Sequence, residues 1–190
     1  MSPRVWAIAA AALADVDALV TSLASSASAA LLDEVGDFDG LLGARLFNGK
    51  GPAFTVSAHA AANAASYVAG STVTVAGWFA GQQVTEVFTL AGTDGGEDFV
   101  GAQPFDKVDS IAIEAQADTS GAWTFGVVDL VSPSGVGFRR IRAATAGSVV
   151  VRFNEDDATD ETIPLAAGEA LEAFFSRVVS TTTIGFRVDL

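Results

Sequence analysis

The chain has 190 residues, half of them hydrophobic, and a mean hydropathy of +0.41, so it carries enough apolar material for a folded core. Ten Lys and Arg stand against 23 Asp and Glu, a formal net charge of −13 that repels nucleic acids and anionic membrane surfaces. The absence of Cys excludes disulfides, thiolate nucleophiles and Cys-based metal sites. We therefore expect neither a nucleic-acid nor a membrane partner.

The amino-terminal segment, residues 1–51, is rich in Ala and Leu, and their propensity favours a helix over Val5–Leu32. Several Ser and Thr within that stretch compete for backbone hydrogen bonds, so a short helix and an extended arm both stay open. The apolar run before Asp15 has the composition of a short signal peptide. It follows a single arginine and is too short to span a bilayer, so we expect it to be retained and not to cross a membrane. Turns are predicted at Asp37–Gly40 and Asn48–Pro52.

Residues 52–130 change to an alternation of polar and apolar side chains, which is typical of half-buried strands. Ser71–Trp78 and Gln83–Leu90 both alternate, and the short connection between them predicts a β-hairpin. Two further strands are predicted, at Ile111–Ala115 and Trp123–Val128. We interpret this region as a first β domain.

Residues 131–190 show the same strand-like alternation after the turn-forming residues Ser132–Gly135. Strands are predicted within Arg140–Ala143, Gly147–Phe153, Thr162–Leu165, Phe174–Val179 and Ile184–Val188. Short strands separated by turn signals at this spacing indicate a sandwich or small barrel. The predicted fold is thus mainly β, with two small β-sandwich or barrel-like units and an Ala-rich amino-terminal arm or short helix.

Catalytic motifs are missing. His59 is the single histidine, and with no Cys it leaves no choice of residues for a Ser–His–Asp or Cys–His arrangement. Gly135-Val136-Gly137 lacks the third glycine of a dinucleotide-binding fingerprint, and no nucleophile elbow or phosphate-binding loop occurs. We predict that the chain is not an enzyme and binds no cofactor.

Two acidic clusters carry oxygen ligands of the kind that calcium prefers. One lies between Glu155 and Glu161, and its spacing does not match an EF-hand loop. The other is Asp37-Phe38-Asp39-Gly40, which has Leu46 where a bidentate Glu would stand. We predict solvent-exposed loops at both places and no metal site.

Aromatic residues suggest two kinds of surface. Trp6, Trp78 and Trp123 could form a sugar-stacking platform, although Trp78 and Trp123 lie in strand-like runs and are predicted to fill the core. Phe174 and Phe175 are adjacent, so in a strand they must face opposite sides. One of them then needs a second apolar surface, which an oligomer interface would supply.

The predicted hairpin also carries a resemblance. Ser71–Gly77, Val84–Leu90 and Phe105–Ile111 resemble a TVTVxG, VTExxxL and F-K-x-V-x-S-I pattern of tailed-phage virion proteins. Asp15–Ser22 is similar to a segment that precedes this module in some of them. The resemblance implies that part of residues 1–51 is integral to the first β domain.

The carboxy-terminal unit resembles a different module. Ile141–Val151, Pro164–Glu169 and Arg177–Ile184 are similar to the head-spike base module of gene-transfer agents and related phages. Ser180–Thr183 departs from that module because it lacks the usual glycine. Neither resemblance implies catalytic residues.

Together the resemblances imply a non-enzymatic virion structural protein, assembled in the host cytoplasm, of the capsid decoration, cement or head-spike type. Its expected partners are the major capsid protein or other virion proteins and further copies of itself in a closed trimer or pentamer. A tail or baseplate component and a carbohydrate- or receptor-binding β module are the alternatives.

Overall fold

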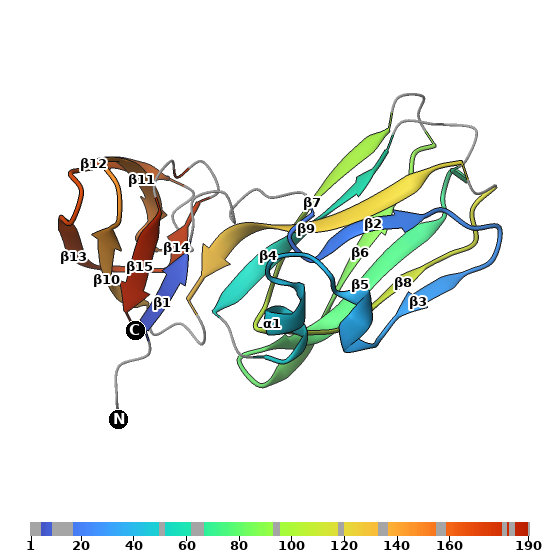
Figure 1. The fold of residues 1–190 in the computed structure, drawn as a ribbon, viewed down its shortest axis with the longest axis horizontal. Coiled ribbons are helices and arrows are strands. Elements are labelled where there is room, and N and C mark those ends of the chain that lie inside the picture. The colour runs from blue at the N-terminus through green and yellow to red at the C-terminus, as the bar shows by residue number, and fades with distance from the viewer. Residues whose placement is uncertain are drawn as a thin grey trace.

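The structure is a computed structural model that describes residues 5–8, 17–49, 52–61, 67–92, 96–117, 120–132, 137–154, 159–179, 182 and 185–189. It is mainly β, as predicted, and its strands form three antiparallel sheets. Figure 1 shows two lobes of unequal size joined by a long strand. We call the larger one the first lobe and the smaller one the second lobe.

One sheet belongs wholly to the first lobe. Its strand order is β3 (Ala30–Leu32), β8 (Lys107–Ile113), β5 (Thr72–Phe79) and β6 (Gln82–Thr89). The pairing of β5 with β6 over all eight residues confirms the predicted hairpin. Ala80 and Gly81 have φ angles of 51° and 80°, the left-handed pair that a two-residue type I′ turn requires.

The largest sheet runs through both lobes (Figure 1). Its order is β12 (Glu161–Leu165), β11 (Gly147–Arg152), β14 (Arg177–Val178), β9 (Ala122–Val131), β4 (Ala53–Ala60) and β7 (Glu97–Phe105), and β2 (Val20–Ala24) also pairs with β9. The end of β9 pairs with β4 of the first lobe and with β14 of the second. Hydrogen bonding is therefore continuous across residues 130 and 131, where the sequence predicts a domain boundary. That boundary stays a prediction about independently folding units.

The third sheet completes the second lobe. It runs β1 (Val5–Ile8), β15 (Phe186–Asp189), β10 (Phe138–Ala143) and β13 (Ala170–Phe175), so the two ends of the chain lie side by side in it. The amino-terminal segment is thus divided. Strand β1 belongs to the second lobe, whereas β2, β3, the 3-10 turn η2 (Val35–Asp37) and the helix α1 (Gly43–Phe47) belong to the first.

The helix that propensity favours over Val5–Leu32 does not form in the described part of that stretch, which contains three strands. Residues 9–16 lie outside the described residues. Strand pairing with distant partners overrides the local preference of Ala and Leu, because propensity is a weak contribution next to tertiary burial. Of the two alternatives for the amino-terminal segment, its described residues up to Leu32 therefore adopt the extended one.

A single cluster of buried side chains connects both lobes. Trp123, Phe125 and Phe54 fill the larger lobe, and Phe138 and Phe186 fill the smaller one. In β5 the buried residues alternate with partly buried ones, so the period-two pattern of that run in the sequence corresponds to the side that faces the core.

Edge strands β6 and β7 are tied together by a carboxylate. Glu86 on β6 accepts hydrogen bonds from the backbone N–H groups of Ala102 and Gln103, at 2.9 and 2.6 Å. These two residues lie where the register of β7 against β4 shifts, so their N–H groups are not used in the sheet ladder. The charged side chain at this edge also disfavours pairing with a foreign strand.

Candidate interaction surface

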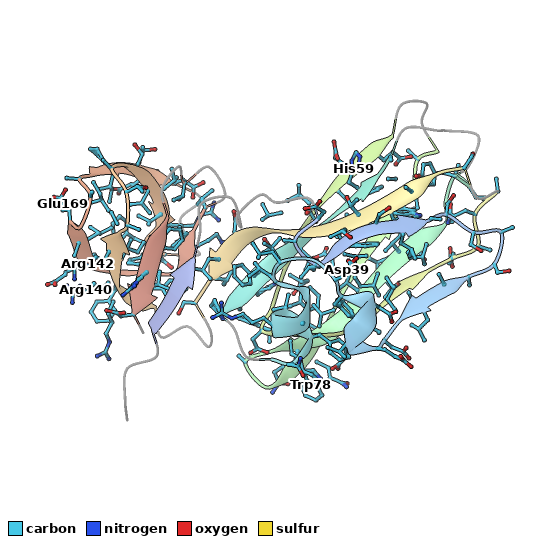
Figure 2. The ribbon with its side chains drawn as sticks, in the orientation of Figure 1. Asp39, His59, Trp78, Arg140, Arg142 and Glu169 are labelled. Carbon is cyan, nitrogen blue, oxygen red and sulfur yellow. The ribbon has the colours of Figure 1, made fainter. Side chains whose placement is uncertain are left out.

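His59 lies on β4 and its Nδ1 contacts the Asp98 carboxylate of the neighbouring strand β7 at 2.5 Å (Figure 2). The two residues are direct cross-strand partners. Asp98 is 80% exposed, so the pair stands in solvent, where such contacts contribute little to stability. The contact of His59 is therefore a cross-strand pair between neighbouring strands.

The acids at the predicted turn bind backbone and hydroxyl groups of the chain itself. Asp39 accepts hydrogen bonds from the N–H and Oγ1 of Thr21, at 2.7 and 2.6 Å. Asp37 accepts the N–H groups of Asp33 and Glu34. These bonds fix the loop between β3 and α1, and among the described residues no three His, Asp or Glu side chains gather as metal ligands.

The second acidic cluster is described only in part, because residues 155–158 lie outside the described residues. Asp160 forms a hydrogen-bonded ion pair with Arg152 at 2.8 Å. Glu161 is exposed at the start of β12. The ion pair of Asp160 joins the segment before β12 to the end of the neighbouring strand β11.

Asp39 gives a pH-dependent contribution to stability. The hydrogen bonds from Thr21, the side-chain bond first, lower the pKa of Asp39 below its ordinary 3.8. A lowered pKa means that this stabilisation is present above pH 3.8 and is lost as the pH falls through the pKa of the folded state. We expect Asp39→Asn to reduce the free energy of unfolding at pH 7 by less than about 1 kcal/mol, because the side chain is exposed.

Urea denaturation at pH 7 and pH 3 measures this effect. The difference between wild type and Asp39→Asn is expected to shrink at the lower pH. At pH 3 the unfolded chain, whose Asp39 has the ordinary pKa of 3.8, gains free energy by binding a proton there. A difference that is equal at both pH values would show that the carboxylate charge has no part in holding Thr21. Asp98→Asn serves as the control at an exposed acid outside this loop.

The tryptophans separate into core and surface. Trp123 is fully buried with Tyr67 edge-on at 5.3 Å, which confirms its predicted core position. Trp78 is instead half-buried on the outer face of the β3-β8-β5-β6 sheet. Its indole N–H donates to Asp109 at 2.7 Å, and the same carboxylate pairs with Lys107. The side chain of Trp6 lies outside the described residues.

The two adjacent phenylalanines at the end of β13 point in opposite directions, as the alternation of a strand requires. Phe175 is 1% exposed and packs on Phe138 at a centroid distance of 5.4 Å. Phe174 is 66% exposed, and the Arg139 guanidinium lies over its ring at 5.9 Å from the centroid. The prediction that one of the pair faces outward is therefore confirmed.

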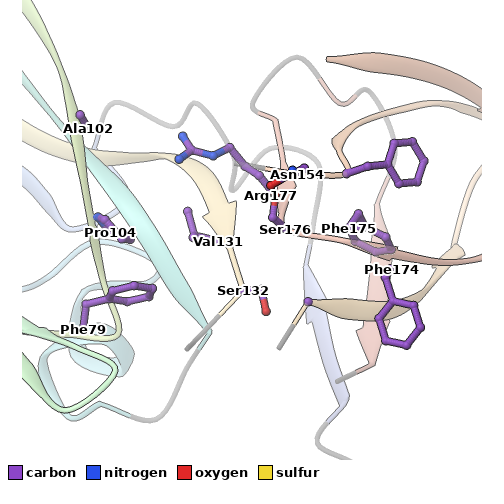
Figure 3. Close-up of a pocket in the computed structure, with 12 residues that line it drawn as sticks. Phe79, Ala102, Pro104, Val131, Ser132, Asn154, Phe174, Phe175, Ser176 and Arg177 are labelled. Carbon is purple, nitrogen blue, oxygen red and sulfur yellow. The ribbon is translucent and has the colours of Figure 1, made fainter. Parts of the chain in front are cut away.

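A cleft of about 690 Å³ opens between the lobes beside this strand. Phe79 and Pro104 line it from the first lobe and Phe174 lines it from the second (Figure 3). Phe153 of the second lobe also lines it. Its floor is the end of β9, where Arg177 forms a largely buried ion pair with Asp129 at 3.1 Å. We call this cleft, with the rings of Phe79, Phe153 and Phe174 that line it, the junction surface.

No protein-family model, curated protein or solved structure matches this chain. None of the helices in the described part of the chain is long and apolar enough to cross a membrane.

Sequence reasoning identified the pair Phe174 and Phe175, without saying which of them faces outward, and missed the rest of the junction surface. Phe79 was expected in the hairpin connection and Phe153 at the end of a strand, and no spacing rule relates the two. They line the same cleft because β9 pairs with strands of both lobes in one sheet. The junction surface can bind an apolar side chain of a partner, and its described residues do not form an arrangement of nucleophile and base.

Proposed function

We propose that this chain is a non-enzymatic structural protein of a phage-like particle, of the capsid decoration, cement or head-spike type. It binds the major capsid protein or other virion proteins and forms a closed oligomer, a trimer or a pentamer. The resemblances of residues 71–111 and 141–184 to virion modules supply the viral context. The exposed Phe174 beside the interlobe cleft is the observation that carries the assembly role.

Apolar burial would supply the affinity of such a contact. Removing apolar surface from water contributes about 25 cal/mol per Å² before the costs of association. A cleft lined by several aromatic rings is the kind of pocket in which one anchoring side chain of a partner contributes most of the binding free energy. An exposed aromatic ring next to such a cleft is unfavourable in a free monomer and favourable once a partner covers it.

Electron microscopy of native particles tests this proposal. Particles from the source culture are banded on a density gradient, and gold-labelled antibody against the chain is applied to the band. We expect the chain to co-band with the particles and the gold to lie on the heads, whereas label on the tail would favour the baseplate alternative. A chain found only at the top of the gradient would overturn the proposal.

Carbohydrate binding is the second candidate, and Trp78 favours it. Its half-exposed ring lies beside Asp109 and Lys107 on an outer sheet face, and aromatic rings next to charged groups can stack on sugars. Titration with a panel of cell-surface polysaccharides, followed by tryptophan fluorescence, measures this directly. Saturable quenching that is lost in Trp78→Phe would support a receptor-binding module. An unchanged spectrum with every polysaccharide would rule out carbohydrate binding at Trp78.

A further inference from the structure

The outer face of the β1-β15-β10-β13 sheet carries an unbalanced pair of arginines. Arg142 on β10 and Arg187 on β15 stand directly opposite each other in the strand register, and both are exposed. The next row differs, because its one arginine, Arg140, lies between the two acids Glu172 and Asp189. Like charges directly opposite on paired strands destabilise a sheet.

Neither arginine is neutralised by the described part of the chain. Arg142 donates its Nε hydrogen to the backbone carbonyl of Gly168 at 3.2 Å, which fixes the side chain without balancing its charge. The side chain of Arg187 has no hydrogen bond or ion pair with the described residues. The two side chains line a recess of about 220 Å³ together with Ala143 and Ala144. Two convergent guanidinium groups beside a recess are suited to binding carboxylates.

The same sheet face carries Phe174. Ala170, Glu172 and Phe174 alternate outward along β13, and Arg139 lies over the ring of Phe174. We call the set Arg139, Arg142, Phe174 and Arg187 the basic face. Figure 2 shows Arg140 and Arg142 projecting from this lobe. The basic face combines an apolar ring with three arginines in a chain whose net charge is −13.

The first lobe carries a segment of complementary character. Leu31 and Val35 are 59% and 51% exposed, and the exposed acids Asp33 and Glu34 lie between them. Strand β3 is at an edge of its sheet, so no neighbouring strand covers its outer side. We call residues 31–35 the acidic ridge. Figure 1 places β3 and the sheet of the basic face in different lobes, so the two surfaces are separate on one chain.

We propose that copies of this chain associate head to tail, with the basic face of one copy binding the acidic ridge of the next. The two arginines receive the carboxylates of Asp33 and Glu34, and Phe174 packs against the exposed aliphatic side chains of the ridge. A contact between two different patches of the same chain is heterologous, and it closes into a ring when the rotation between copies allows. This inference rests on the proposed assembly function and names a second copy as the partner.

A nucleic acid is the other polyanion that arginines bind. The net charge of −13 opposes that partner over the whole molecule, whereas the acidic ridge offers a short segment with two carboxylates. Charge complementarity over a limited area fixes the register of an interface and favours one partner over others.

Charge exchange between the two surfaces tests the proposal by sedimentation velocity across a range of concentrations. Wild type is expected to self-associate. The variants Arg142→Glu/Arg187→Glu and Asp33→Arg/Glu34→Arg are each expected to associate more weakly, on the order of tenfold or more. Mixing the two variants is expected to restore association with alternating copies. The reversed face of one variant meets the reversed ridge of the other, and the unchanged face of the second meets the unchanged ridge of the first. The chain carrying all four changes is expected to associate as wild type does.

Arg45→Glu/Gln82→Glu/Gln83→Glu is the control for the face variant, because it lowers the net charge by the same amount as Arg142→Glu/Arg187→Glu at positions outside both surfaces. It is expected to leave association unchanged. Circular dichroism melts establish that every variant is folded. A wild-type chain that stays monomeric, or a mixture that does not associate, would overturn the head-to-tail contact. Binding of that monomer to particles would leave the proposed virion role intact and remove its closed oligomer. Head-to-tail association without particle binding would overturn the proposed function alone.

Discussion

Replacing Phe175 with alanine is expected to lower the free energy of unfolding by about 3–5 kcal/mol, the range for removing a buried aromatic side chain from a core. The ring is 1% exposed and packs on Phe138, so its loss leaves a cavity in the second lobe. The same change at Phe174 is expected to alter stability by about 0.5 kcal/mol or less, because that ring is 66% exposed. Urea denaturation followed by circular dichroism measures both values.

The two variants differ by one position and remove the same atoms, so each is the matched control of the other. Phe174→Ala is expected to weaken association while leaving the fold intact, and Phe175→Ala to weaken the fold. Equal destabilisation by both would contradict the assignment of Phe174 to a surface and Phe175 to the core. A stable Phe174→Ala chain that associates as wild type does would remove Phe174 from the interface.

Gly40→Ala is expected to destabilise the chain by about 1–3 kcal/mol, the usual cost of forcing extra atoms into a packed site. A methyl group at this position would overlap the backbone of Asp17 and Ala18. The close approach is fixed by hydrogen bonds from Gly40 to Leu19 and from Leu42 to Ala18. This contact packs residues 17–19, which precede and begin β2, against the loop between β3 and α1, so its loss is expected to loosen β2 as well.

Gly36→Ala is the control for that substitution. Gly36 lies a few residues away in η2, and a methyl group there would meet no atom within 4 Å. Its expected effect on the melting temperature is small, whereas Gly40→Ala is expected to lower it by several degrees. Equal melting temperatures for the two variants would show that residues 17–19 are not packed against Gly40.

Local pattern was enough to predict much of the fold. The β5–β6 hairpin follows from two alternating runs and a short turn, because both signals lie within twenty residues of each other. The opposite orientation of Phe174 and Phe175 follows from strand geometry alone. Each of these predictions depends on neighbouring residues, and for that reason a single sequence could supply it.

The remaining features depend on contacts between distant residues. The pairing of β1 with β15 joins the two ends of the chain, and the hydrophobic periodicity of the sequence does not indicate which strands pair. The opposition of Arg142 and Arg187 needs the register of β10 against β15, which sequence spacing does not define. Trp78 was predicted as core because its strand alternates, but it lies on the outward set of positions. The assignment of alternating positions to one face or the other is settled by tertiary packing.

Quantitative co-sedimentation of the purified chain with phage-like particles that lack it tests the assembly role most directly. We expect saturable binding, with Phe174→Ser weakening it on the order of tenfold because an aromatic anchor is lost from the contact. Arg45→Glu is expected to bind as wild type does. A chain that stays in the supernatant at every concentration, with its fold confirmed by circular dichroism, would contradict the assembly role.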